Sequence, residues 1–305
     1  MKLPTRIPFM AIRNIAFAIT VVISLIGLGS LFKHGLNFGL DFTGGTLIEL
    51  TYDKPADLEL IKRELGQVGY SDAVVQSFGS TTDVLVRLAG DSPDLGNEVA
   101  TALRKIDDTS FEVKRVEFVG PQVGEELRDQ GGLAMLLALG GILLYLAFRF
   151  QWKFGVGAVG SLAHDIIVTL GILAFFKVPF DLTVLAAVLA MVGYSLNDTI
   201  IIYDRIRENF RVMRKADIIE NIDVSVTQTL LRTIATSLST ALALIALLVF
   251  GGDSLGGFAL TLLIGVVVGT YSSVYISAPV LIWLKLTSED LIPPAADAEG
   301  VDDRP

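Results

Sequence analysis

Six long apolar runs constrain this chain more than any other feature of its sequence. Runs of roughly 18 residues or more without charge argue for transmembrane helices. Three runs carry no charge, at 15–32, 131–148 and 233–252, and three longer runs are interrupted only by His164 and Asp165 (154–176), by Asp198 (182–203) and by Pro279 (256–284). Hydrophobic residues make up 52% of the chain, more than a soluble protein of this length needs. We therefore predict six transmembrane helices.

Lysine and arginine predict the orientation of these helices, because short loops rich in them stay in the cytoplasm. They gather in residues 1–14, beside 149–153 and in 204–232, whereas the opposite short loops hold only Lys177. The first run is longer than the core of a signal peptide and no cleavage signal follows it, so we expect an uncleaved helix. Both termini should be cytoplasmic, and residues 33–130 should lie outside, as expected for a multi-pass membrane protein.

Residues 33–130 form the one large segment outside the predicted membrane. They hold 18 acidic and 10 basic residues, and the whole chain has a net charge of -9, so binding to nucleic acid is excluded. The chain has no cysteine, which excludes disulfides and thiolate metal sites.

Hydrophobic periodicity within this segment alternates between strand and helix. Strand patterns at 46–52, 73–78, 84–88 and 110–119 are separated by helical patterns at 57–68 and 95–106. The order strand, helix, strand, strand, helix, strand is the ferredoxin-like plan. We predict a polytopic α-helical membrane protein with a small α+β ferredoxin-like (βαββαβ) extracytoplasmic domain.

Two other segments flank the predicted helices. Residues 204–232 interleave basic and apolar residues, which is typical of an amphipathic helix bound to membrane lipids and equally of a solvated hairpin. Residues 285–305 are acidic and contain few apolar residues, and we expect a disordered cytoplasmic tail.

Asp198, beside Asn197, interrupts the apolar run 182–203. A carboxylate at membrane depth costs a few kcal/mol, so it is a candidate functional residue; the alternative is a polar contact that fixes helix register. Arg232 lies just before the next run and could either reach the headgroups or pair with Asp198. Asp198, Arg232 and Asn197 are therefore candidate proton-coupling residues.

His164 and Asp165 are the polar residues of the run 154–176. Adjacent residues on a helix point about 100 degrees apart, so we expect no compact pair of ligands and no metal site. A proton relay and a structural contact between helices are both compatible with the two residues. Small residues four positions apart, Gly157 with Ser161 and Gly265 with Gly269, predict close helix packing.

No phosphate-binding loop, catalytic triad or metal cluster is visible in the sequence. We therefore expect neither an enzyme nor a cofactor, and a transport activity would take its energy from an ion gradient or from a partner. Such a gradient supplies about 2.3 kcal/mol per charge per 100 mV.

Several spaced motifs resemble those of the SecF family of protein-export membrane proteins, which is related to the RND transporters. They are FGLDFTGG at 38–45, VGPQVG at 119–124, YSLNDT at 194–199, YDRIREN at 203–209 and QTLLRT at 228–233. The resemblance extends from residue 37 to about residue 284.

The resemblance implies a subunit of the Sec translocase that works with SecD and uses the proton-motive force to promote polypeptide export. Asp198 would be the proton-binding carboxylate and Arg232 its charge partner. The SecD half is missing from this chain, so a SecD partner is expected. The implied partners are SecD, the SecYEG channel and the translocating unfolded polypeptide, with YajC and SecA as further candidates. Motif residues that we expect at the roots of the outer domain, as hinges or as simple turns, are Gly39, Asp41, Gly44, Gly45, Gly120 and Pro121.

Two alternatives remain open from the sequence. An RND-type exporter of small molecules would also carry acidic residues in its helices, although the outer segment here is small for that class. A structural assembly subunit without ion coupling would use Asp198 only to fix helix register. The sequence does not distinguish a proton from a sodium ion.

Overall fold

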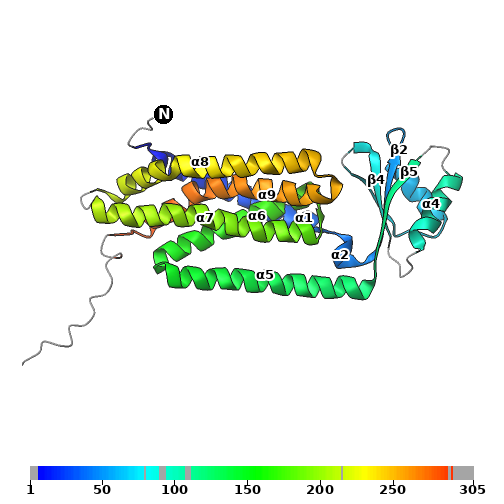
Figure 1. Cartoon of the computed structure of the whole chain (residues 1–305), viewed down its shortest axis with the longest axis horizontal. Helices are drawn as coiled ribbons and strands as arrows, with labels where there is room; N and C mark the ends of the chain where they lie inside the picture. The colour runs from blue at the N-terminus through cyan, green and yellow to red at the C-terminus, as the bar shows by residue number, and fades with distance from the viewer. Residues whose placement is uncertain are drawn as a thin grey trace, which may run out of the picture. The chain divides into compact units, whose positions relative to one another are not determined.

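The computed structural model of the chain describes residues 6–78, 80–88, 94–106, 111–213, 216–287 and 290. The chain folds as two compact units (Figure 1). Residues 38–134 form a sheet unit, and the remainder forms a helical unit.

The helical unit consists of long apolar helices. Its elements are η1 (Phe9–Ile12), α1 (Arg13–His34), the later part of α5 (Pro121–Arg149), α6 (Trp152–Phe175), the two-residue strand β6 (Pro179–Phe180), α7 (Leu182–Val212), α8 (Ile218–Phe250), α9 (Asp253–Ser272), the π-helical segment η2 (Ser273–Ser277) and α10 (Ala278–Trp283). Among the described residues, six helices are long and apolar enough to cross a membrane, and α9, η2 and α10 together make the sixth. The prediction of six spans is confirmed.

Several helices extend beyond the apolar runs. Helix α5 begins at Pro121 rather than at residue 131, and α7 continues to Val212. The separate amphipathic connector expected over 204–232 is wrong, because most of it belongs to the ends of α7 and α8. Beyond the apolar run, side chains of opposite charge three residues apart can pair and support the helix. Arg205 and Glu208 form such an ion pair at 2.6 Å. The expected tail at 285–305 lies mostly outside the described residues.

Helices α6, α7 and α9 form the buried centre of the helical unit, whereas α5 and α8 are largely exposed within it. Small residues allow the close contacts there. A Cβ atom on Gly269 of α9 would lie 2.9 Å from the Cβ of Ser195 on α7, and one on Gly157 of α6 would lie 2.9 Å from the carbonyl oxygen of Ser277. These glycines are packing residues, as predicted from their spacing.

The last span contains a π-helical segment, η2, between α9 and α10. Pro279, early in α10, has no backbone N–H to continue the α-helical pattern. The hydroxyl of the buried Tyr203 donates a hydrogen bond of 3.1 Å to the carbonyl oxygen of Ser277, the last residue of η2. This contact satisfies a buried polar group of α7 at an irregular turn of its neighbour.

The sheet unit has the predicted order of elements. They are β1 (Asn37–Phe38), α2 (Leu40–Thr43), β2 (Gly45–Tyr52), α3 (Leu58–Gln67), β3 (Val74–Phe78), β4 (Ser80–Leu88), α4 (Leu95–Ile106), β5 (Phe111–Val119) and the first turns of α5. The four longer strands form one sheet in the order β3-β4-β2-β5, and the neighbouring pairs are antiparallel. The order strand, helix, strand, strand, helix, strand is confirmed, whereas β1 and α2 were not anticipated.

One face of this sheet packs against α3 and α4. Alternate residues of the strands, such as Ile48, Leu50 and Val86, are fully buried with Leu65 of α3 and Leu103 of α4. The Asp57 side chain caps α3 by accepting hydrogen bonds from the backbone N–H groups of its first turn. A small apolar core thus holds the unit together.

Candidate functional site

Asp198 lies on α7 with only 1% of its surface exposed. Neither of its carboxylate oxygens has a hydrogen-bond partner among the described residues. Leaving a buried polar group without a partner costs free energy, and more when the group is charged. Asp198 is therefore a costly group in the most buried part of the helical unit.

The two residues expected to hold Asp198 do not contact it directly. Arg232 is exposed on α8 and attracts the Asp198 carboxylate electrostatically, but in the described part of the chain no ion pair within 4.0 Å joins them. Asn197 is also exposed, so it lies on a different face of α7 from the buried Asp198. Asn197, although a candidate proton-coupling residue, does not hydrogen-bond the carboxylate, because adjacent residues of a helix face different directions.

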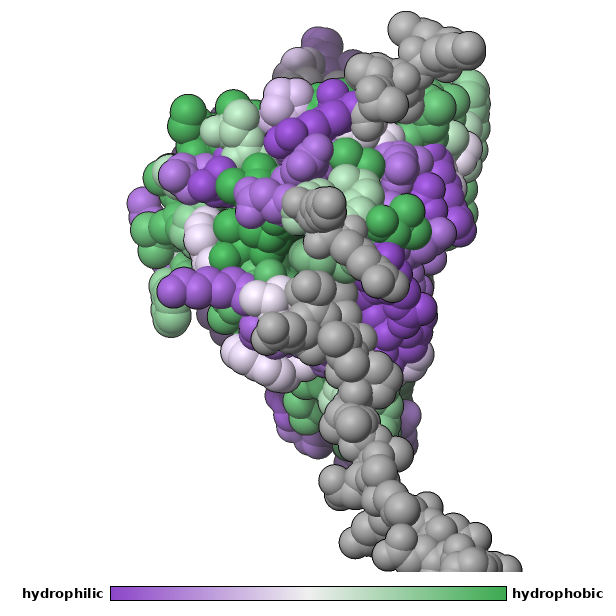
Figure 2. Space-filling view, turned by 90° about the vertical axis from the view of Figure 1, so that its left-hand side faces the viewer, coloured by the Kyte–Doolittle hydropathy of each residue, from purple (hydrophilic) through white to green (hydrophobic). Residues whose placement is uncertain are grey.

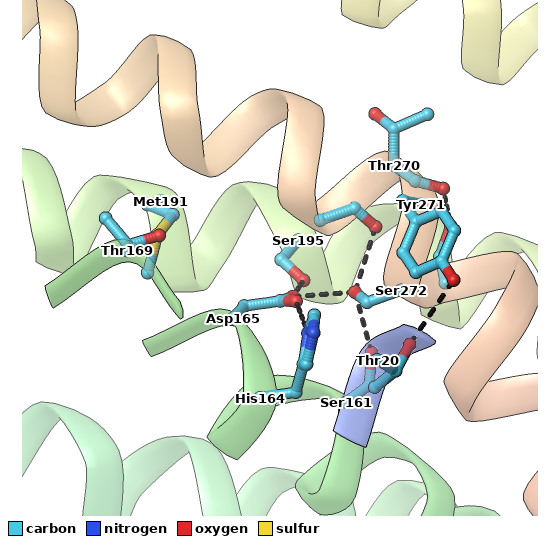
Figure 3. Close-up of polar contacts among 12 residues, drawn as sticks. Thr20, Ser161, His164, Asp165, Thr169, Met191, Ser195, Thr270, Tyr271 and Ser272 are labelled. Carbon is cyan, nitrogen blue, oxygen red and sulfur yellow. Dashed lines mark hydrogen bonds and ion pairs between the residues drawn. The ribbon is translucent and has the colours of Figure 1, made fainter. Parts of the chain in front are cut away.

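His164 and Asp165, by contrast, do contact each other. The Nδ1 atom of His164 lies 2.9 Å from Oδ1 of Asp165, and both side chains are buried (Figure 3). This contact between the two side chains was not predicted from their positions on the helix. The separation of about 100 degrees applies to their Cα–Cβ bonds, whereas side-chain torsions bring the polar ends together.

Serine hydroxyls from two other helices complete this cluster (Figure 3). Ser195 of α7 and Ser272 of α9 both donate to Oδ2 of Asp165, the latter at 2.8 Å. Ser161 of α6 donates to the Ser272 hydroxyl at 2.9 Å. Sequence reasoning missed Ser195 and Ser272; a signal was available in Ser195, which lies one helical turn before Asp198. Among the described residues, no group of three or more histidine or acidic side chains could hold a metal ion.

The motif residues at the roots of the sheet unit are closely packed within that unit. Gly44 has a φ of +64° and Gly45 a φ of +107°. A Cβ atom on Gly44 would lie 2.9 Å from the Cα of Pro121, the first residue of α5. The first glycine of the motif, Gly39, precedes α2, and Asp41 lies in the first turn of that helix.

Gly120 differs from these glycines, since its φ is not positive and a Cβ there would meet nothing within 4 Å. Close approach and left-handed backbone thus explain Gly44 without any hinge, and a hinge at these positions remains a hypothesis.

Another buried carboxylate, which sequence reasoning missed, lies near the beginning of α8. Asp223, 1% exposed, pairs with Arg6 at 3.0 Å and accepts a hydrogen bond of 2.9 Å from the backbone N–H of Met10. The N-terminal segment is thereby fixed to α8. Figure 2 faces the end of the helical unit where α8 begins and shows hydrophilic residues there beside hydrophobic ones. Arg149 and Asp204, an ion pair of 2.8 Å, belong to this end.

Family models match most of the chain. The model described as "Protein export membrane protein SecD/SecF, C-terminal" matches residues 98–287, and the "SecD/SecF GG Motif" model matches residues 29–56. The protein translocase subunit SecF of Pseudomonas aeruginosa is 67% identical over 300 residues, which cover 98% of each chain. The chain belongs to the SecF family. It is therefore a multi-pass membrane protein of a family of translocase subunits.

Other SecF-family proteins are similar over their full length. SecF of Vibrio alginolyticus is 47% identical over 99% of this chain and 97% of its own. The crystal structure of the translocon-associated membrane protein SecDF from Thermus has a TM-score of 0.83 and 37% identity over 92% of this chain. A SecDF structure in a super-membrane-facing form has a TM-score of 0.68 and 38% identity. This chain spans only about 39–40% of those SecDF chains.

Proposed function

We propose that the chain works with a SecD partner and uses the proton-motive force to promote the export of unfolded polypeptides through the SecYEG channel. YajC and SecA are further candidate partners. The proposal places both termini in the cytoplasm and the sheet unit outside, in agreement with the lysine and arginine of the short loops. Membership of the SecF family supports the translocase role.

The burial of Asp198 without a hydrogen-bond partner is the observation that supports proton coupling. A carboxylate that is buried in an apolar helical unit and has no hydrogen-bond partner among the described residues weakens the fold. A proton binding to it removes its charge and much of that cost. Such a group responds to a proton gradient in a way that a fully hydrogen-bonded carboxylate does not.

In the proposed mechanism, Asp198 is ionised in one state and is attracted by Arg232 of α8. A proton that enters from the outer side neutralises Asp198, and the attraction between α7 and α8 is lost. Helix α8 is little buried within this chain, so it can move with a small loss of contacts. The chain connections at Gly44-Gly45 and Gly120-Pro121 would pass the movement to the sheet unit.

The test is preprotein export into inverted membrane vesicles, with and without a proton gradient, for wild type and Asp198→Asn. We expect the variant to lose stimulation by the gradient while its level in the membrane, and that of SecD, stays normal. Glu208→Gln removes an exposed acid from the end of the same helix and should keep the stimulation.

A variant Asp198→Asn that exports with the full stimulation would contradict the coupling role and favour a structural subunit. Sodium can be distinguished in the same assay, by replacing the proton gradient with a sodium gradient. Stimulation by sodium alone would also contradict proton coupling.

A further inference from the structure

Asp165 is the most highly coordinated carboxylate at membrane depth in the described part of the chain. Its side chain is fully buried on α6. It forms hydrogen bonds with Ser195 of α7, Ser272 of α9 and the adjacent His164 (Figure 3). Asp198 is equally buried but has no such contacts. The two carboxylates therefore have different chemistry although both lie in the helical unit.

The groups around Asp165 use both of its carboxylate oxygens as hydrogen-bond partners. Both serine hydroxyls donate to Oδ2, and the imidazole of His164 meets Oδ1 at 2.9 Å. Hydrogen bonds donated to a carboxylate stabilise its charge. When this carboxylate is ionised it only accepts hydrogen bonds, so the Nδ1 atom of His164 then carries the proton between them.

This arrangement fixes the tautomer of His164. A neutral imidazole with its proton on Nδ1 has a lone pair on Nε2. Among the described residues, no side chain or backbone group forms a hydrogen bond with Nε2, and His164 is only 7% exposed. A basic nitrogen is therefore oriented by a carboxylate and left open, as in other Asp–His pairs that accept protons.

We propose that Nε2 of His164 is a second proton-binding site of the helical unit, separate from Asp198. A proton forms a bond to the Nε2 lone pair, Nδ1 keeps its own proton, and the resulting imidazolium forms an ion pair with Asp165. The negative charge of the pair is thereby cancelled inside the unit. The ligand of this site is a proton, and no metal is needed.

In the part of the chain that the structure describes, the helices packed against α6 carry no cation at this depth, and Arg232, which attracts Asp198, is exposed on α8. Among the described residues, α1 carries no charged side chain between Arg13 and Lys33, and α10 carries none. The ionisable side chains at membrane depth on the elements packed against α6 are Tyr194, Asp198, Tyr203, Tyr271 and Tyr275. The hydroxyls of Tyr203 and Tyr271 donate to backbone carbonyls. Asp165 and Asp198 are therefore the anions that favour a positive charge on His164.

Proton binding at His164 would reach α7 through Ser195. When the imidazole becomes an imidazolium, it attracts the Asp165 carboxylate more strongly and competes with the two serine donors. Ser195 lies one turn before Asp198 on α7, so a change at Asp165 acts on the helix that carries Asp198. A role of His164 in export rests on the proposed function. Proton binding at His164 does not depend on it.

The test is nitrogen NMR of the full chain in lipid nanodiscs, with histidine labelled by ¹⁵N. The chain has only two histidines, His34 and His164, so His34→Gln leaves the signals of His164 alone. We expect the neutral ring to be a single tautomer with its proton on Nδ1, and the doubly protonated ring to form as the pH is lowered. Asp165→Asn should abolish the preference, so that both neutral tautomers are seen.

Two results would overturn the proposal. One is a neutral ring with its proton on Nε2; the other is a ring that stays neutral down to the lowest pH at which the chain remains folded. The first needs no change at Asp165, so a folding defect of Asp165→Asn does not prevent the test. Because the spectrum reports on the His164 ring and not on export, its outcome is independent of the Asp198→Asn assay.

Discussion

The guanidinium of Arg6 lies 3.0 Å from the carboxylate of Asp223, and this ion pair joins the N-terminal segment to the first turns of α8. A second contact supports it, because the backbone N–H of Ile7 donates to the Thr227 hydroxyl at 2.9 Å. The same helix carries Arg232 about two and a half turns further on. The N-terminal segment therefore fixes the end of a helix whose membrane part is little buried.

Asp223→Ala is expected to destabilise the helical unit. The change leaves the buried backbone N–H of Met10 without its acceptor, and an unpaired buried donor costs about 1–3 kcal/mol. Arg6→Ala should cost less, since the Arg6 side chain is 42% exposed and its loss leaves the Met10 contact intact. Thermal unfolding of the purified chain measures both. An equal loss in the two variants would contradict the importance of the Met10 contact.

Gly157→Ala is expected to disturb packing around Tyr203. The added Cβ would lie 2.9 Å from the Ser277 carbonyl oxygen and against the Tyr203 hydroxyl, and overpacking of this kind typically costs about 1–3 kcal/mol. Gly160→Ala, on the same helix, meets nothing within 4 Å and should be neutral or slightly stabilising, because alanine favours helix. The difference in melting temperature between the two variants is the measurement. A Gly157→Ala variant as stable as Gly160→Ala would show that the contact relaxes freely.

Comparing Gly44→Ala with Gly120→Ala tests whether the glycines at the base of the sheet unit are needed for close packing or for backbone flexibility. Gly44 has a positive φ and closely approaches Pro121, so alanine there should cost more than about 1 kcal/mol. Gly120 has neither constraint, and Gly120→Ala should keep the stability of the sheet. Hydrogen exchange of the β2 and β5 amides reports on this unit alone. A loss of export in Gly120→Ala with normal exchange would instead support a hinge there.

Asp83 gives the sheet unit a defined pH dependence. Hydrogen bonds from Thr51 and Ser80, with a smaller contribution from Lys114, lower the pKa of Asp83 below its usual value of 3.8. Because the folded pKa lies below the unfolded one, the stabilisation is complete above about pH 4 and is lost as the pH falls through the folded pKa.

Asp83→Asn should therefore weaken protection of the β4 amides at neutral pH, by about 1 kcal/mol, with a difference from wild type that shrinks as the pH falls below 4. Comparing wild type and variant at each pH cancels the intrinsic change of exchange rate. Thr51→Val keeps the carboxylate and removes one donor, at 2.6 Å, so its effect should be intermediate. A difference that stays constant down to pH 2 would contradict the assignment.

The fold was predictable from the sequence because its signals are strong. Apolar runs as long as 233–252 have few alternatives to a membrane helix, and the alternating strands around 46–52 and 84–88 bury their apolar residues on one face. The ends of helices were less predictable. Helix α7 continues through charged residues to Val212, because Ile206 and Phe210 remain buried on one face of it while Arg205 and Glu208 pair at its surface.

The candidate site was predictable only in part. Asp198, His164 and Asp165 could be identified because each interrupts an apolar run. The residues that contact them could not be identified in this way. Asn197 faces away from Asp198, whereas Ser195 and Ser272 reach Asp165 from other helices. A serine is common in membrane helices, so its position in sequence carries little information until the helices are packed.

Replacing Asp165 and replacing Asp198 should change the stability of the helical unit in opposite directions. Asp165→Leu leaves Ser195 and His164 without this partner, and each unpaired buried group costs about 1–3 kcal/mol, whereas Ser272 can still donate to the carbonyl oxygen of Gly269 at 3.1 Å. Asp198→Leu removes a buried group that has no hydrogen-bond partner among the described residues, so the melting temperature should stay the same or rise.

Thermal unfolding of the two variants in one detergent, beside the isosteric Asp165→Asn and Asp198→Asn, measures this difference. A residue that weakens the fold and yet is needed for gradient-dependent export acts in function and not in packing. If Asp198→Leu were as destabilised as Asp165→Leu, the carboxylate would have a structural partner, and the register hypothesis would replace proton coupling at Asp198.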